Sequence, residues 1–192
     1  MRITASAATW LSVAAVLFWA NPVLPSSKIA GVTLDDTINI DGTALVLNGA
    51  GLRKKLFIKL YVGSLYVAEK SADATQLIEA QSPMMIQLNI LSDLLTRDKM
   101  IKALQDGFSK STNGDVSAIQ EQIDQLIAAA GDSIRPGDNF TVFYHPDTGS
   151  RVYLNGEAVA DIEGHAFKQA LFGIWLSDNP VQGSLKRAML GK

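Results

Sequence analysis

The sequence predicts an α+β protein in which an antiparallel sheet has helices packed on one face. Segments that alternate apolar and polar residues fall into two groups, each punctuated by Gly, Asn, Asp or Pro. Each group is followed by segments whose apolar residues recur every three or four positions, which is the helical period. The resulting order of strands, helices, strands and helices is typical of α+β proteins, because a parallel α/β fold alternates its elements regularly.

The composition favours one globular domain. The chain has 192 residues, of which 47% are hydrophobic and 19% are charged, as expected for a domain with a sizeable core. The net charge of −2 and the lack of a large basic patch argue against a nucleic-acid partner. The chain has no cysteine, which excludes disulfides and thiolate metal sites. His145 and His165 lack metal-ligand spacing, so we expect no metal and no cofactor.

The first 27 residues resemble a targeting segment more than part of a folded domain. A positive start at Met1-Arg2 precedes an apolar, uncharged run at 8–20. This run is shorter than the ~20 residues that a membrane span needs, so it fits a secretory signal peptide best. An uncleaved N-terminal anchor is the alternative. We therefore expect a domain at 28–192 that is periplasmic or otherwise exported, with membrane contact only through an uncleaved N-terminal segment.

The first group of strands predicts a β-meander. Asp41-Gly42 marks one of its turns, and a glycine-rich turn is expected at 48–51, because glycine permits tight bends. A short helix is expected at 73–80. The strands are expected at 32–34, 38–40, 43–47, 56–67 and 84–91.

The second half of the chain predicts two helices, a second meander and two more helices. Thr96 and Asp115 are expected to cap the first two helices. Asn155-Gly156, between two alternating runs, is the strongest hairpin signal in the chain. The last two helices are expected at 165–176 and from about 182 to 190.

Two segments resemble the chalcone isomerase family. Leu47-Asn48-Gly49-Ala50-Gly51-Leu52-Arg53, with the apolar run up to Val67, is similar to the Gly-x-Gly-x-Arg turn and the following strand of that family. The segment from Ala170 to Gly191 resembles the C-terminal end of its bacterial chalcone-isomerase-like members. The resemblance implies an open-faced β-sandwich, which agrees with the α+β pattern. Such folds host both catalytic and binding members.

Arg53 and Tyr61 are the candidate ligand-binding residues. The planar guanidinium of Arg53 suits a carboxylate or a phenolate. The resemblance implies that the matching arginine polarises the substrate in catalytic members and grips the lipid carboxylate in fatty-acid-binding relatives. Tyr61 falls where catalytic members carry a threonine, and its hydroxyl would share the anion with Arg53. The simpler alternatives are a solvated arginine and a tyrosine that only packs on a half-buried strand.

The remaining positions depart from the catalytic pattern of the family. Met100 falls near the expected tyrosine, a residue near Gly107 replaces the expected asparagine, and Phe172 or Gly173 replaces a late threonine. One arginine does not supply the constellation that ring closure of a chalcone needs. We therefore assign no catalytic residue and lean against an enzyme.

The sequence supports three hypotheses about function. The first is a non-catalytic protein that binds a small amphipathic carboxylate or phenolic ligand, such as a fatty acid, in an apolar cleft. The second is an isomerase or lyase acting on an unsaturated carbonyl compound. The third is a structural or partner-binding envelope protein, which a cleft filled by large side chains would favour.

Overall fold

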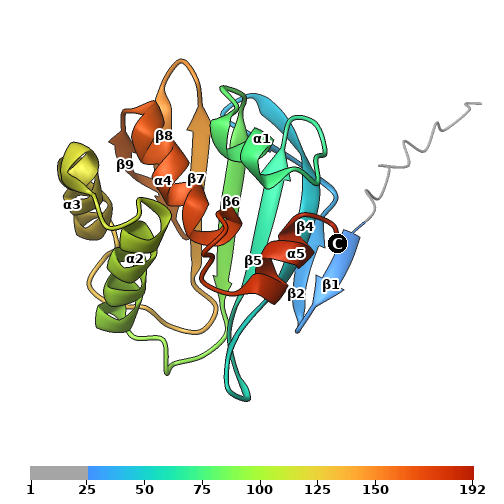
Figure 1. Ribbon diagram of the computed structural model, residues 1–192. Coiled ribbons are helices and arrows are strands. Elements are labelled where there is room, and N and C mark those ends of the chain that lie inside the picture. The colour runs from blue at the N-terminus through green and yellow to red at the C-terminus, as the bar shows by residue number, and fades with distance from the viewer. Residues whose placement is uncertain (1–25) are drawn as a thin grey trace, which may run out of the picture.

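A single curled antiparallel sheet forms the centre of the protein, for which the computed structural model describes residues 26–192 (Figure 1). Seven strands lie side by side in their order along the chain, and every neighbouring pair is antiparallel. A separate two-stranded sheet pairs β1 (Ser26–Ile29) with β2 (Val32–Asp35). The seven are β3 (Thr37–Ile40), β4 (Thr43–Lys55), β5 (Ile58–Val67), β6 (Met84–Ile90), β7 (Asn139–His145), β8 (Gly149–Leu154) and β9 (Glu157–Ile162).

Helices cover one face of this sheet, as predicted (Figure 1). The main core lies between them and combines apolar side chains from alternate strand positions, such as Leu65 and Val67, with those of the helices, such as Phe108 and Phe167. The helical elements are α1 (Ala74–Glu79), α2 (Arg97–Ser111), the 3₁₀ turn η1 (Ser117–Ile119), α3 (Gln120–Ala128), α4 (His165–Leu176) and α5 (Gly183–Met189).

The glycine-rich turn predicted at 48–51 is wrong, because β4 continues through it with only a shift of register between Leu47 and Gly49. A Cβ on Gly49 would collide with the carbonyl oxygen of Ala188, and a Cβ on Gly51 would lie 2.6 Å from the Cβ of Ala188. The glycines therefore let α5 lie directly on the strand. The true turn is Leu56-Phe57, so β5 starts two residues later than predicted.

Local signals elsewhere agree well with the structure. The side chain of Thr96 accepts a hydrogen bond from the Lys99 amide and caps α2. Asn155 and Gly156 both have positive φ, at 52° and 85°, in the hairpin between β8 and β9. Asp115 accepts hydrogen bonds from Ser117 and so precedes η1, whereas we expected it to cap the long helix directly.

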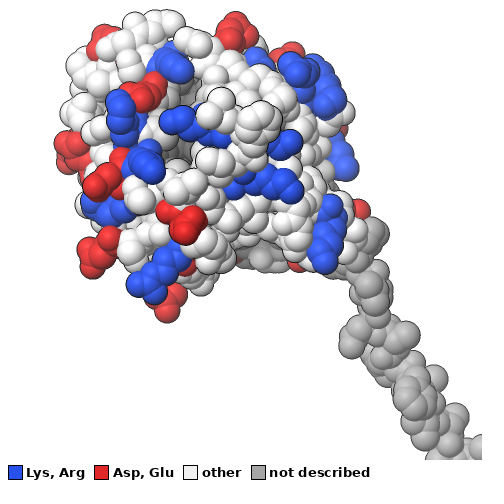
Figure 2. All heavy atoms as spheres, turned by 90° about the horizontal axis from the view of Figure 1, so that it is seen from below, with Lys and Arg blue, Asp and Glu red and all other residues white. Residues whose placement is uncertain are grey.

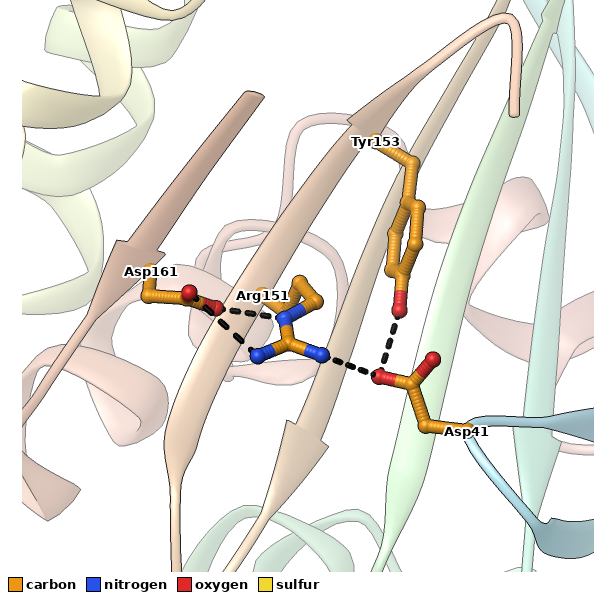
Figure 3. A network of polar contacts seen from close by, with 4 residues as sticks. All are labelled: Asp41, Arg151, Tyr153 and Asp161. Carbon is orange, nitrogen blue, oxygen red and sulfur yellow. Dashed lines mark hydrogen bonds and ion pairs between the residues drawn. The ribbon is translucent and has the colours of Figure 1, made fainter. Parts of the chain in front are cut away.

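The second face of the sheet carries a smaller apolar cluster, which is formed by Leu45, Tyr66, Met85 and Phe143. The hairpin of β3 and β4 lies over this cluster, since Ile38 and Ile40 pack against it. The turn of the hairpin is tied to β8 and β9 by a polar network of Asp41, Arg151, Tyr153 and Asp161 (Figure 3). This contact joins the β3–β4 turn to β8 and β9, which lie at the opposite end of the sheet order. The two ends can meet only because the sheet is strongly curled.

The predicted targeting segment lies outside the described residues, apart from Ser26 and Ser27, which begin β1. Among the helices of residues 26–192, none is long and apolar enough to cross a membrane. The localisation proposed from the sequence therefore stays a prediction.

Candidate functional site

Arg53 and Tyr61 lie directly opposite each other on neighbouring strands β4 and β5. Paired residues of an antiparallel ladder project their side chains to the same face. Here that face carries the helices, since Tyr61 belongs to the main core. The structure thus brings together the two residues that the sequence singled out.

Only one of the three nitrogens of the Arg53 guanidinium, Nη1, donates hydrogen bonds within residues 26–192. Its Nη1 donates to the carbonyl oxygen of Lys54 at 2.7 Å and to Oε1 of Gln182 at 3.0 Å. Within residues 26–192, no carboxylate forms an ion pair with it, and its Nε and Nη2 groups have no hydrogen-bond acceptor. Half of the planar fork is therefore open to an anion.

Gln182 is the positioning residue that sequence reasoning missed. Its Oε1 also accepts from the Lys54 amide at 2.9 Å, and its Nε2 donates to the carbonyl oxygen of Leu52 at 3.0 Å. One side chain just before α5 thus fixes both the end of β4 and the arginine. The only signal in the sequence was its place in the C-terminal segment that resembles the family.

Arg53 lies at the wall of a groove of about 520 Å³ between the β4–β5 hairpin and the start of α2. This volume lies within the usual range for small-molecule sites, roughly 300–1,000 Å³. The apolar lining is Leu56, Ile58, Leu60, Leu94, Leu95 and Ala103. Lys55, Lys99 and Lys102 add positive charge, and the one carboxylate of the lining, Asp106, already pairs with Lys102 at 3.2 Å.

Tyr61 is buried, with 6% of its surface exposed, and lies outside the lining of this groove. Its hydroxyl accepts a hydrogen bond of 3.0 Å from Nε1 of Trp175 on α4. Burial raises the pKa of Tyr61, while the bond from Trp175 and the charge of Arg53 act to lower it. The phenol is therefore neutral at pH 7, and residues 26–192 offer no acceptor for its own proton.

The interior behind Tyr61 is nearly full. The apolar space between the sheet, α2, α3 and α4 has a volume of about 30 Å³ and is lined by residues such as Leu88, Leu104 and Trp175. A Cβ on Gly107 would lie 2.8 Å from Ile174, and one on Gly173 would lie 3.0 Å from Ser111. These two glycines thus allow α2 and α4 to pack closely. A ligand the size of a fatty acid enters this space only if one of the surrounding elements moves.

Besides Arg53, the protein contains a buried cation, which lies away from the groove. Lys168 on α4 is fully buried, and its Nζ donates to the carbonyl oxygens of Leu77, Ile78 and Ala80 at 2.9, 2.8 and 2.7 Å. These carbonyls end α1, where a cation is favourable. Burial lowers the pKa of Lys168 to about 8. The sequence did carry a signal, because Lys168 shares a helix face with Leu171 and Phe172.

The two histidines make separate polar contacts. His165 Nδ1 lies 3.2 Å from the hydroxyl of Tyr144, and His145 Nδ1 lies 3.8 Å from Asp147. The part of the chain that the structure describes contains no group of three or more metal-ligating side chains.

The fold and the comparison with family models together define the class of protein. The model of the chalcone isomerase-like family matches residues 26–191, so the chain belongs to that family. The crystal structure of a fatty-acid binding protein from Arabidopsis thaliana has a similar fold, with a TM-score of 0.68 and 17% sequence identity. The match covers 86% of this chain and 96% of that one. No curated protein matches at a significant level.

Proposed function

We propose that this protein binds a small amphipathic anion, such as a fatty acid, without catalysis, and that Arg53 pairs with the charged head group. The observation that carries the proposal is a half-open guanidinium at an apolar groove. A guanidinium with free N–H groups binds a carboxylate through two parallel hydrogen bonds. The fatty-acid-binding relative of similar fold gives this ligand class additional support.

The charge around the groove favours an anion over a neutral ligand. Lys55 and Lys99 lie around the same space as Arg53, while Lys102 pairs with the nearby carboxylate of Asp106. The apolar lining suits an alkyl or aromatic tail. The ligand therefore lies along the groove, with its head at Arg53 and its tail against Leu60 and Leu95.

Tyr61 is buried and lies outside the lining of the groove, so only a head group that moves inward past Arg53 would reach it as the second residue of the proposed site. Its hydroxyl has a donor in Trp175 and a free proton of its own. A buried hydroxyl without an acceptor is unfavourable, so an anion that is drawn inward from Arg53 gains a hydrogen bond there. A phenolic ligand would use the same pair of groups.

Native mass spectrometry of residues 26–192 with added palmitate tests this proposal. The wild-type protein is expected to form a one-to-one adduct, and Arg53→Ala to weaken it about ten- to hundredfold, since a charge-assisted hydrogen bond contributes about 1.5–3 kcal/mol. Arg135→Ala, which removes an exposed arginine elsewhere, is the matched control and should bind as the wild type does. Equal binding by Arg53→Ala would contradict the role of Arg53, and an empty wild-type protein would contradict the lipid proposal altogether.

The packed interior supports a second candidate, a structural or partner-binding protein of the same family. The apolar pocket between sheet and helices has a volume of only about 30 Å³, and the rings of Phe108 and Phe167 stack in the main core with their centroids 5.8 Å apart. Crosslinking in cells distinguishes this candidate, because a specific protein partner in the absence of any co-purified acid would favour it.

A further inference from the structure

The turn between β4 and β5 carries two large apolar side chains in solvent. Leu56 is 86% exposed and Phe57 is 99% exposed. The other tight hairpin turns in residues 26–192 have small or polar residues with glycine, namely Ala30-Gly31, Asp41-Gly42 and Asn155-Gly156. Those residues suit a hairpin turn, whereas Leu56-Phe57 does not.

The turn is unfavourable in its backbone as well as in its exposure. Leu56 has a φ of 56°, a left-handed value that bulky residues rarely adopt. Asn or Gly at this position would relieve both problems. Residues that are unfavourable both in backbone conformation and in exposure are typical of functional sites.

Four cations lie directly behind this apolar tip. Arg53, Lys54, Lys55 and Lys59 flank the turn, and no acidic residue occurs between 53 and 59. Leu94, in the neighbouring loop, adds an apolar side chain that is 48% exposed. That loop and the start of α2 also carry Asp93 and Asp98, so the positive charge of this end comes mainly from the hairpin. Figure 2 views the molecule from this end, and basic side chains are spread around an uncharged central area.

We propose that the β4–β5 tip, defined as residues 53–59, docks on the surface of a membrane that contains anionic lipid. An apolar turn flanked by basic side chains matches the layering of a bilayer interface, in which apolar groups enter below the anionic head groups. Leu56 and Phe57 enter the interface, and the lysine side chains keep their charges at the head groups. The two exposed apolar side chains of this tip are too few for a stable protein interface, which needs roughly 800 Å² from each partner.

The tip also forms one wall of the groove, since Arg53, Lys55, Leu56 and Ile58 all line it. Docking therefore places the groove against the membrane, where amphipathic acids reside. The docking surface lies on the hairpin itself and does not depend on lipid binding in the groove.

Vesicle flotation of residues 26–192 tests the proposal. This segment contains the whole sheet, all the described helices and both apolar clusters, and it lacks the apolar run at 8–20 that would itself bind lipid. Wild-type protein is expected to float with vesicles of equal parts phosphatidylglycerol and phosphatidylcholine, and to stay behind with phosphatidylcholine alone. The same protein with Phe57→Trp should show a blue shift of its tryptophan emission when only the mixed vesicles are added.

Two variants separate the apolar and electrostatic contributions. Leu56→Asn with Phe57→Gly installs the favourable Asn-Gly turn and is expected to weaken flotation at least tenfold while leaving the fold intact. Lys54→Gln with Lys55→Gln should weaken it roughly tenfold or more and reduce its dependence on salt. Lys70→Gln with Lys110→Gln, which removes the same charge elsewhere, should leave flotation unchanged.

Equal flotation by the Asn-Gly variant, or no flotation of the wild type on the mixed vesicles, would overturn the proposal. Palmitate binding in vesicle-free solution is measured separately, so failure of one proposal is distinguishable from failure of the other.

Discussion

The indole Nε1 of Trp175 donates a hydrogen bond of 3.0 Å to the hydroxyl of Tyr61, two residues that are 114 positions apart in the chain. The bond joins α4 to the centre of β5 and fixes the phenol beside the paired Arg53. In this bond the oxygen of the Tyr61 hydroxyl is the acceptor, so its own proton remains available to donate a hydrogen bond. The contact is therefore part of both the core and the proposed site.

Tyr61→Phe is expected to destabilise the fold by about 1–3 kcal/mol, because the buried indole N–H of Trp175 loses its acceptor. Chemical denaturation of the variant measures this. Trp175→Phe with Tyr61→Phe removes both polar groups, so the double variant should be less destabilised than the sum of the single variants. Additive losses would show that the hydrogen bond contributes little. Palmitate binding by Tyr61→Phe should fall less than in Arg53→Ala.

Lys168 is expected to make stability depend on pH in the alkaline range. Its folded pKa of about 8 lies below the ordinary 10.5, so between these values the unfolded chain binds more protons than the folded one. Stability therefore rises with pH in this window, by about 2 kcal/mol between pH 8 and 10. Above pH 10 the trend reverses, since burial raises the pKa of Tyr66 to about 12 and the folded state then holds more protons. Denaturation at a series of pH values reads both slopes.

Lys168→Met provides the comparison for this pH profile. The rise between pH 8 and 10 should disappear, and stability at pH 7 should fall by roughly 1–3 kcal/mol, because the carbonyls at the end of α1 lose their donor. Lys110→Met, on the exposed face of α2, should keep the wild-type profile. A rise of equal size in Lys168→Met would assign it to another group.

Gly49→Ala is expected to destabilise the protein by about 1–3 kcal/mol or more, since the new Cβ collides with backbone atoms of α5. Gly63→Ala on the neighbouring strand is the control, because its Cβ would meet only ordinary contacts of 3.4–3.6 Å. Thermal denaturation of both variants measures the difference. A tolerated alanine at 49 would mean that α5 is free to shift from β4.

Leu56→Asn alone is expected to stabilise the protein by about 0.5–1 kcal/mol. Asparagine tolerates the left-handed backbone better than leucine does, and the substitution removes an apolar side chain from water. Lys55→Asn, at a neighbouring position of ordinary φ, should give no such gain. Denaturation midpoints compare the two, and a loss of stability in Leu56→Asn would mean that Leu56 has a structural role.

Much of the secondary structure was predictable because its signals are local. The bounds of α4, the cap at Thr96 and the hairpin at Asn155-Gly156 each depend on residues within a few positions of one another. The turn predicted at 48–51 was wrong because local signals do not report distant contacts. Gly49 and Gly51 lie against Ala188, which is more than 130 positions away in the chain (188 − 49 = 139 and 188 − 51 = 137). No local rule distinguishes glycines that permit such a contact from glycines that form a turn.

The candidate site divides in the same way. The sequence by itself determined the α+β class, the resemblance to the chalcone isomerase family and the choice of Arg53 and Tyr61. Only the tertiary structure placed Gln182 against Arg53 and Trp175 against Tyr61, showed a nearly filled interior, and put Leu56 and Phe57 at a bare tip. Periodicity and caps are set by neighbours along the chain, whereas contacts across more than a hundred residues depend on how the sheet and helices pack together.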